Sequence, residues 1–297
     1  MSARIPNCFV AGAPRCGTTF LSLALAAHPD AYVCDMKEPH FFGAPPQGYH
    51  YDGPGDSYLN GTWVSDEERY LSLYRDRAER VWIDGSTTLM FWPDAVREIV
   101  RRQPEATFFV VLRDPVARAE SAYTRHRGQG LEPAPRLVDA IDDELAGRRS
   151  TWSPGFRYVE QGRYGAALDE LEPMLGQRLH VLRFDDLIAA PEPSIRAAWR
   201  ALGLADDVEV VIPEETNASP DVGNRLLTYL FVRPLRIRSA VAARLPERLV
   251  ERAKAWRASQ RATTDDDTEA RNRLREIYAD DLRRLEQRRG IVLASRP

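Results

Sequence analysis

Near its N-terminus the chain reads Phe9-Val10-Ala11-Gly12-Ala13-Pro14-Arg15-Cys16-Gly17-Thr18-Thr19, and the rest of the sequence is organised around this stretch. Its apolar start predicts a strand over residues 7–11, and the pattern after the loop predicts a helix from Thr18 to about Ala27. A strand, a glycine-bounded loop and a helix start can hold a phosphate group, because the loop amides point inward and the helix N-terminus adds partial positive charge.

The loop departs at one position from the nucleotide-binding pattern GxxxxGK[ST]. Gly12 and Gly17 have that spacing, but Thr18 stands where the pattern has lysine. ATPases and kinases use this lysine to reach the β- and γ-phosphates of a magnesium-bound triphosphate. In this loop the positively charged residue is Arg15, which comes before the second glycine. The loop is therefore typical of a phosphate site that is unsuited to a magnesium-bound triphosphate. A tight turn that binds nothing is the alternative interpretation of the loop by itself.

Composition limits the class of protein. The chain has 297 residues, 43% of them hydrophobic, which is ample for a sizeable core. Because no internal repeat is present, we expect a single domain over residues 1–297. The net charge of −3 excludes the global basic field of nucleic-acid binders. Of the 41 basic residues only Lys37 and Lys254 are lysine, so the chain is rich in arginine.

Three cysteines, Cys8, Cys16 and Cys34, show no spacing typical of metal sites, and we interpret them as free thiols in a reducing compartment. We expect no bound metal. No signal peptide is recognised, and no apolar run approaches the roughly 20 residues that span a bilayer. The sequence therefore predicts a cytoplasmic protein without a membrane partner.

Strands alternate with helices along the chain. Strands are predicted at 7–11, 81–85, 106–112 and 179–184, and the intervening helices at 18–27, 93–102, 137–145, 164–175 and 193–202. This alternation predicts an α/β protein with a P-loop-like, three-layer fold, in which helices flank a central, mainly parallel sheet. Asp114 and Pro115 are typical of the cap and first residue of a further helix.

Two segments lack this alternation. Residues 43–64 are rich in Gly, Pro, Tyr and Asp, and we expect a long loop that binds the acceptor; residues 152–158 are expected to shape the same pocket. After it, Ser65 is predicted as the N-cap of a helix that continues to Tyr74, with Glu68 as the other half of a capping box. A C-terminal helical segment is predicted over about 226–290, including helices at 246–259 and 268–289.

A second candidate anion site lies at the end of the central strand. Arg113 follows this strand directly, where ligands bind in open α/β sheets, and Ser121 lies about two helical turns further on. Together they are suited to bind a second phosphate away from the first. The alternative is that Arg113 pairs with an acid and Ser121 faces solvent.

These motifs carry a resemblance to a known family. The segment 14–19 resembles the 5′-phosphosulfate motif of sulfotransferases that use 3′-phosphoadenylyl sulfate (PAPS), and 108–123, with Arg113 and Ser121, resembles their 3′-phosphate motif. Lys37-Glu38-Pro39-His40-Phe41-Phe42 is similar to a segment of carbohydrate and heparan-type sulfotransferases, whose catalytic glutamate corresponds to Glu38. The resemblance covers most of the chain from residue 7 to about 204.

The resemblance implies PAPS as donor and adenosine 3′,5′-bisphosphate (PAP) as product, without a metal. It implies Glu38 as general base, Arg15 as stabiliser of the departing oxygen, and His40 as the alternative base; Lys37 either stabilises the moving sulfuryl group or is simply solvated. The implied donor-binding residues are Pro14, Arg15, Cys16, Gly17, Thr18, Thr19, Arg113, Ser121 and Arg225.

The chain also departs from the family pattern. Gly85 stands where glycosaminoglycan-type members carry a catalytic lysine, which disfavours a glycosaminoglycan acceptor and leaves Lys37 or an arginine to replace it. Near it, Ser86 and Thr88 are candidate acceptor or donor contacts.

The predicted function is therefore a bacterial sulfotransferase that moves a sulfuryl group from PAPS to a hydroxyl or amine of a small-molecule natural product or carbohydrate. One alternative is a small-molecule kinase or nucleotide hydrolase with Asp84 as its acid. Another is a nucleotide-binding scaffold without activity. Binding of PAP without magnesium, compared with ATP and magnesium, separates the first two.

Overall fold

The computed structural model describes residues 4–211 and 267–293. Its centre is a five-stranded sheet with the order β2-β3-β1-β4-β5, in which every neighbouring pair is parallel. The strands are β1 (Cys8–Gly12), β2 (Ala31–Val33), β3 (Val81–Asp84), β4 (Thr107–Leu112) and β5 (Leu179–Arg183). The predicted α/β fold with a parallel sheet is confirmed, and the segment after His28 supplies a fifth strand.

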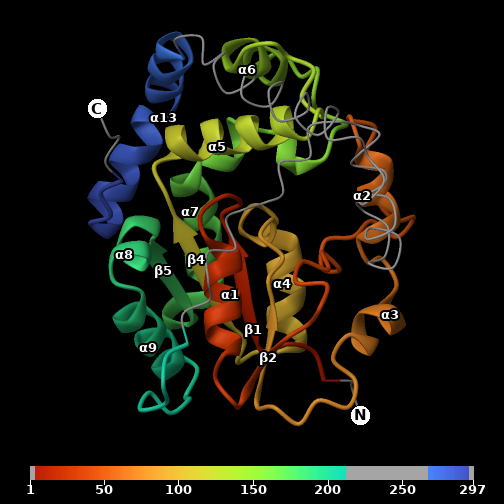
Figure 1. Ribbon diagram of the computed structural model, residues 1–297, viewed down its shortest axis with the longest axis vertical. Coiled ribbons are helices and arrows are strands. Elements are labelled where there is room, and N and C mark those ends of the chain that lie inside the picture. Colours follow the sequence, from red (N-terminus) through yellow and green to blue (C-terminus); the bar gives the residue numbers. More distant parts are fainter. Residues whose placement is uncertain (1–3, 212–266, 294–297) are drawn as a thin grey trace, which may run out of the picture.

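Helices connect the strands and cover both faces of the sheet (Figure 1). Between β1 and β4 the chain forms α1 (Thr18–Ala26), α2 (Asp56–Thr62), α3 (Glu67–Ser72), the 3-10 turn η1 (Leu89–Phe91) and α4 (Pro93–Arg102). Beyond β4 it forms α5 (Pro115–Gly128), α6 (Leu137–Leu145), η2 (Pro154–Phe156), η3 (Glu160–Gly162), α7 (Tyr164–Leu175), η4 (Gly176–Arg178), α8 (Phe184–Ala189), α9 (Pro191–Ala201) and α13 (Thr268–Arg289).

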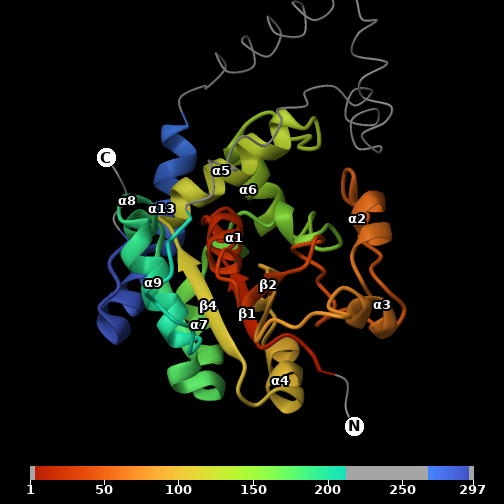
Figure 2. The same ribbon diagram turned by 60° about the horizontal axis from the view of Figure 1, so that its bottom comes forward.

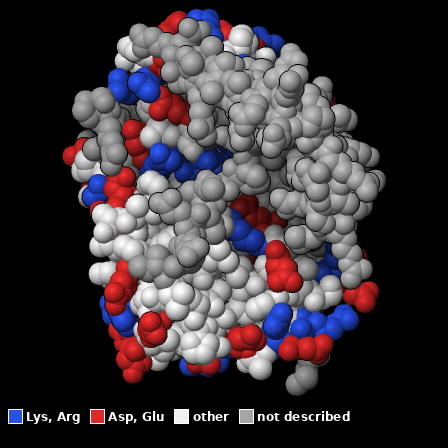
Figure 3. Space-filling model, in the orientation of Figure 1, with Lys and Arg blue, Asp and Glu red and all other residues white. Residues whose placement is uncertain are grey.

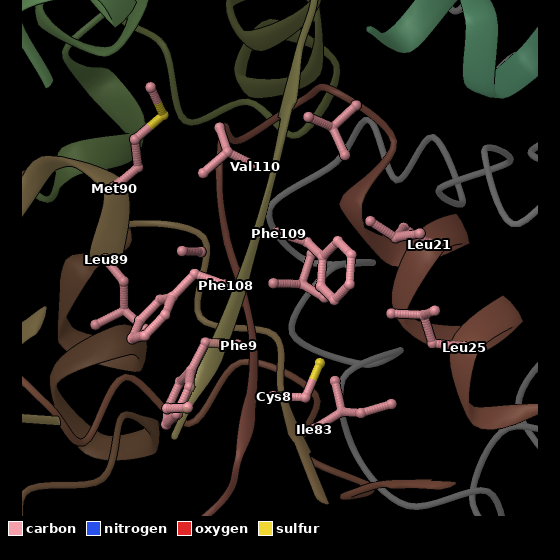
Figure 4. Packing of buried hydrophobic residues seen from close by; sticks show 14 of the residues in the cluster. Cys8, Phe9, Leu21, Leu25, Ile83, Leu89, Met90, Phe108, Phe109 and Val110 are labelled. Atoms are coloured by element: carbon pink, nitrogen blue, oxygen red, sulfur yellow. The ribbon is translucent and has the colours of Figure 1, made fainter. Parts of the chain in front are cut away.

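The main core lies on both sides of the strands. In Figure 4, Leu21 and Leu25 of α1 lie on the side of β4 to which Phe109 points, whereas Leu89 and Met90 lie on the side of Phe108. This alternation follows from the period of two along a strand, and a strand that is apolar on both faces is typical of a parallel sheet covered by helices. Helix α9 contacts α1, and α7 contacts α4 and η1.

A smaller apolar cluster lies where α5, α6 and α13 meet. Leu274 and Tyr278 of α13 are buried there against Val116 of α5 and Ile141 of α6. Leu282, one turn further along α13, packs against both this cluster and the main core. The contact of the C-terminal helix with both clusters supports our proposal of a single domain.

The site is positioned by the connections at one edge of the sheet. From β1 the chain continues to β2 and β3 on one side, and β4 and β5 lie on the other, so the carboxyl ends of β1 and β4 border a topological switch point. Helix α5 begins directly after β4 and crosses above the sheet, whereas α2 and α3 lie at the flank opposite α8, α9 and α13 (Figures 1 and 2).

Most predicted boundaries agree with the structure, including Asp114 as the cap of α5, where its side chain accepts a bond from Val116 N (2.9 Å). The prediction of a structureless stretch over 43–64 was wrong, because α2 lies inside it. The predicted capping box at Ser65 was also wrong. Asp66 is the N-cap, since its carboxylate accepts from Arg69 N at 2.7 Å, and the helix ends at Ser72.

Two further differences concern helices. Helix α8, directly after β5, was not predicted. The predicted helix at 268–289 is confirmed as α13, while the remainder of the segment 226–290, with the helix expected at 246–259, lies outside the described residues.

Candidate active site

A cavity of about 1320 Å³ opens at the carboxyl ends of β1 and β4. The phosphate loop, the end of β4 and one side of α5 border it at one end, while α2 and the turn η2 border it at the other. Of the predicted site residues, the following line it: Pro14, Arg15, Gly17, Thr18, Thr19, Glu38, His40, Arg113 and Ser121. The structure thus brings together motifs that lie up to a hundred residues apart.

The loop between β1 and α1 has the backbone that a phosphate cradle needs. Arg15 and Gly17 both have positive φ (68° and 81°), so the chain turns sharply before entering α1. A side chain at Gly17 would lie 3.1 Å from the ring of Phe184, which explains glycine at this position. The thiol of Cys16 points instead into the core, within 3.7 Å of Tyr164 Oη. Its predicted contact with the donor can therefore come only from the backbone.

The two predicted anion-binding motifs meet directly. Arg15 donates from Nε and Nη2 to Ser121 Oγ, at 3.2 and 3.1 Å. Arg113 donates from Nη1 to the carbonyl of Arg15 (3.5 Å), and its guanidinium lies 4.8 Å from the centre of the Phe184 ring. The alternative in which Ser121 faces solvent without a partner does not hold.

Four arginines line this end of the cavity: Arg15, Arg113, Arg118 and Arg125. Burial, together with the charges of Arg125 and Arg113, lowers the pKa of Arg15 to about 10. Arg118 is fully buried, and its Nε and Nη1 have no hydrogen-bond partner within the described residues. Such a concentration of positive charge at a helix start is typical of a site for several anionic groups. Figure 3 shows basic side chains, in blue, gathered near the middle of one face of the molecule.

Sequence reasoning did not find Arg118. A signal was present, since Arg118 and Ser121 are three residues apart and so lie on the same side of α5. Burial of the whole side chain, however, depends on tertiary packing against Tyr158, whose carbonyl accepts a bond from Arg118 Nη2.

Glu38 lies between three partners. Lys37 Nζ donates to its Oε1, Thr87 Oγ1 donates to its Oε2 at 3.0 Å, and His40 Nε2 lies 3.3 Å from Oε2. Burial opposes ionisation of this carboxyl, but Lys37 and His40 outweigh it and hold the pKa of Glu38 well below its usual range. About a third of the side chain is exposed, so the carboxylate is both ionised and accessible from the cavity.

Three contacts fix the position of His40. Its backbone N–H donates to Ser86 Oγ (2.8 Å), its Nδ1 lies 2.9 Å from Thr88 Oγ1, and its ring stacks on Trp63 at 3.9 Å. The predicted direct contact of Ser86 and Thr88 with a ligand is not supported, because both are buried, neither lines the cavity, and both hold His40. Thr87, between them, is the member that lines the cavity.

The position of Gly85 bears on the missing lysine. A Cβ at Gly85 would lie 2.9 Å from the carbonyl of Lys37 and 3.4 Å from its Cγ. The Lys37 side chain therefore starts directly over the position where relatives of the glycosaminoglycan type carry their lysine. Lys37 and His40 both have positive φ (45° and 55°). Strained backbone of this kind persists where the surroundings fix it and is common at functional sites.

Two other predicted residues, Asp84 and Lys37, do not line the cavity. Asp84, the acid of the kinase alternative, is buried, accepts a bond from Tyr70 Oη at 2.8 Å and does not line the cavity. Burial raises its pKa. Lys37 reaches the site through Glu38 and does not itself line the cavity. Arg225 lies outside the described residues.

Within residues 4–211 and 267–293, no group of three or more His, Cys, Asp and Glu side chains is placed to hold a metal ion. In the same part of the chain, no helix combines the length and the apolar character needed to cross a membrane.

Comparison with known proteins agrees with this geometry. Residues 6–208 match the model of the sulfotransferase family, and the chain belongs to this family. A crystal structure of a sulfotransferase from Alicyclobacillus acidocaldarius superposes with a TM-score of 0.67 and 28% identity, covering 82% of this chain and 98% of that one. The solved relative therefore has the same fold over nearly its whole length.

Two curated relatives match shorter regions. The omega-hydroxy-beta-dihydromenaquinone-9 sulfotransferase Stf3 of Mycobacterium tuberculosis is 30% identical over 107 residues, which are 35% of this chain and 24% of the relative. Carbohydrate sulfotransferase 15 of Rattus norvegicus is 27% identical over 150 residues, 40% of this chain and 27% of the relative. The chain thus aligns with about a quarter of the length of each.

Proposed function

We propose that this protein transfers a sulfuryl group from PAPS to a hydroxyl or amine of a small acceptor. The observation that carries the proposal is that both anion-binding motifs and Glu38 line one cavity. A donor with a phosphosulfate at one end of its ribose and a 3′-phosphate at the other needs two separate anion sites, and PAPS is the donor that the family uses.

Different residues of the chain are suited to bind different parts of the donor. The backbone N–H groups of residues 15 and 17–19, at the start of α1, are suited to hold the 5′ end, and Arg15 is suited to stabilise the negative charge that the departing oxygen gains. Arg113 and Ser121 are suited to the 3′-phosphate. The buried Arg118, whose Nε and Nη1 have no partner within the described residues, adds positive charge at the same end of the cavity.

In the transfer, the sulfur–oxygen bond to the 5′-phosphate breaks, a bond from sulfur to the acceptor forms, and the acceptor proton passes to Glu38. A carboxylate with a low pKa is a weak base, but the attacking oxygen becomes acidic as it bonds to sulfur, so Glu38 is needed only late in the step. His40 and Thr87 orient the carboxylate through Oε2. His40 remains the alternative base.

Lys37 is proposed as a positioning residue that keeps Glu38 ionised and aimed at the acceptor. Its side chain starts over Gly85 and its ammonium bonds to Glu38 Oε1. This arrangement supports Lys37 as the replacement for the lysine that is missing at Gly85.

Calorimetric titration tests the proposal. PAP is expected to bind without magnesium, and ATP with magnesium is expected to bind at least about tenfold more weakly, because Thr18 replaces the lysine that contacts a triphosphate. The opposite order would favour the kinase alternative, and no binding of either nucleotide would overturn the proposal. Binding of PAP without sulfuryl transfer from PAPS to any acceptor would support the scaffold alternative. The buried position of Asp84 argues against a kinase acid there.

A further inference from the structure

Helix α5, where it faces the turn η2, contributes to the cavity wall a histidine, His126, whose protonation is fixed by its neighbours. Tyr158 Oη donates its only proton to Glu132 Oε2 at 2.6 Å, and Arg149 donates to both oxygens of Glu132 at 2.8 Å. Tyr158 Oη can therefore only accept from His126 Nδ1, 3.0 Å away. It follows that Nδ1 carries the proton and that Nε2 carries a lone pair.

The edge of the ring that carries this lone pair lies beside Gly155. A Cβ at Gly155 would lie 3.3 Å from Cε1 and 3.4 Å from Nε2 of His126, so the glycine leaves this edge of the ring uncovered, and both residues line the cavity. The other face of the ring stacks on Phe156 at 4.2 Å. Burial, with the charges of Arg125 and Arg15, lowers the pKa of His126 to about 3, so the ring is neutral at working pH. His126 thus offers a hydrogen-bond acceptor.

A second acceptor lies in the same wall. Asp56, at the start of α2, is fully buried and lines the cavity. Its Oδ2 accepts from Gly53 N (2.9 Å) and Ser153 N (2.8 Å), which ties α2 to the turn beside His126. Its Oδ1 is buried and has no partner in the described part of the chain. A buried carboxylate oxygen without a partner costs free energy, so a ligand that donates to it is favoured.

The surface around these two acceptors is largely apolar. The remaining lining on this side includes Tyr58, Leu59, Trp63, Leu131 and Phe156. Tyr58 is more than half exposed, so its ring is accessible to a ligand in the cavity. The acidic side chains of the lining are Asp56 in α2 and Glu38 on the border with the donor end. The arginines belong to the phosphate loop, to the end of β4 and to α5, which also carries His126.

From this arrangement, and resting on the proposed sulfuryl transfer, we propose that Asp56 Oδ1 and His126 Nε2 form an acceptor subsite for a molecule with an apolar ring body that bears a hydroxyl or amine donor besides the group that is sulfated. The two carboxylates disfavour an acceptor that carries carboxylate or sulfate groups. The subsite thereby selects against acidic glycans and for uncharged or cationic hydroxylated rings.

A matched set of naphthols tests the subsite on the complex of the protein with PAP. The probes are 6-hydroxy-, 6-amino-, 6-methoxy- and 6-carboxy-2-naphthol, which differ only in the group offered to the far wall. Calorimetry is expected to show the hydroxy and amino probes binding about tenfold or more tightly than the methoxy probe, with the carboxylate weakest. Equal binding of the four, a preference for the carboxylate, or no binding at all would overturn the subsite.

Two variants test whether Asp56 and His126 cause the preference for the hydroxy probe over the methoxy probe. Asp56→Asn keeps an oxygen for Gly53 N and Ser153 N but presents an amide N–H₂ in place of Oδ1, so it should remove the preference for the hydroxy probe over the methoxy probe. Gly155→Ala covers the Nε2 edge of His126 without changing its bond to Tyr158 and should reduce the same preference. Unchanged preference in both variants would contradict the assignment.

Two controls separate this inference from the proposed function. Asp52→Asn changes an exposed carboxylate that bonds Thr151 Oγ1 at 2.7 Å beside the cavity without lining it, and it should leave all four affinities unchanged. PAP affinity should be the same in every variant. If the unmodified protein fails to bind PAP, the proposed function fails; if PAP binds and the probes show no preference for donors, only the subsite fails.

Discussion

The two ends of the cavity are built in different ways. The donor end consists of a loop and strand ends fixed by the sheet, and its charged side chains are arginines. The acceptor end consists of the short helix α2, the turn η2 and the part of α5 that carries His126, and it presents the Asp56 carboxylate, a neutral histidine and aromatic rings. The difference supports the proposal that the donor end binds an anion, whereas the acceptor end depends on contacts between segments about a hundred residues apart, such as Asp56 with Ser153.

The largest expected effect is at Glu38, on the border between the two ends. Glu38→Gln keeps the shape of the side chain but cannot take the acceptor proton, so turnover of 6-hydroxy-2-naphthol with PAPS should fall by about 10²- to 10⁴-fold. PAP affinity should remain close to that of the unmodified protein. Glu67→Gln, at an exposed carboxylate of α3 paired with Arg102, is the control and should change neither quantity. Loss of PAP binding in Glu38→Gln would remove Glu38 from the base role.

A substitution confined to the donor end should have a smaller effect than the one at Glu38. Arg113→Ala removes a charged donor and should raise the dissociation constant of PAP by about 10- to 100-fold in calorimetry. The difference in affinity between the naphthol probes should persist at saturating PAP. Arg183→Ala removes the arginine at the end of the neighbouring strand β5, which does not line the cavity, and should have little effect. If Arg113→Ala and Arg183→Ala weaken PAP binding equally, the loss comes from reduced positive charge in general and not from a specific contact with the 3′-phosphate.

The smallest effect at neutral pH is expected at Lys37. The Lys37 ammonium lowers the pKa of Glu38, so the basic, ionised form persists into acid. In Lys37→Met this charge is lost while burial still opposes ionisation, so the pKa of Glu38 rises. The acid limb of the pH profile of kcat/KM should then move to higher pH, with little change above pH 7. Lys37→Arg keeps the charge and should restore the profile; an unshifted limb in Lys37→Met would contradict the positioning role.

The donor end was largely predictable from sequence. The loop at residues 12–19 and the segment from Arg113 to Ser121 each follow a buried strand, and the carboxyl ends of parallel strands meet at one edge of the sheet. Local patterns therefore implied that these residues lie close together. What they did not imply is the direct bond of Arg15 to Ser121, or the burial of Arg118, because both depend on how α5 packs above the loop.

The acceptor end was much less predictable. Its composition, rich in Gly and Pro, concealed α2, whose first residue is held by a tertiary contact with Ser153. His126 gave no signal, because its role follows from a chain of bonds through Tyr158 to Glu132. Ser86 and Thr88 were candidate contacts of the acceptor or donor, but their side chains bond to His40, a difference that only side-chain direction decides.

The sequence by itself determined the parallel sheet, the phosphate loop and the acid beside it, since strand periodicity, glycine spacing and a short motif around Glu38 are all local properties. The tertiary structure decided that Asp56 Oδ1 has no partner within the described residues, and that the bond of His126 Nδ1 to Tyr158 leaves Nε2 as the acceptor. The physical reason is that a hydrogen bond is satisfied or left open only when distant segments come together, and no pattern along the chain records this.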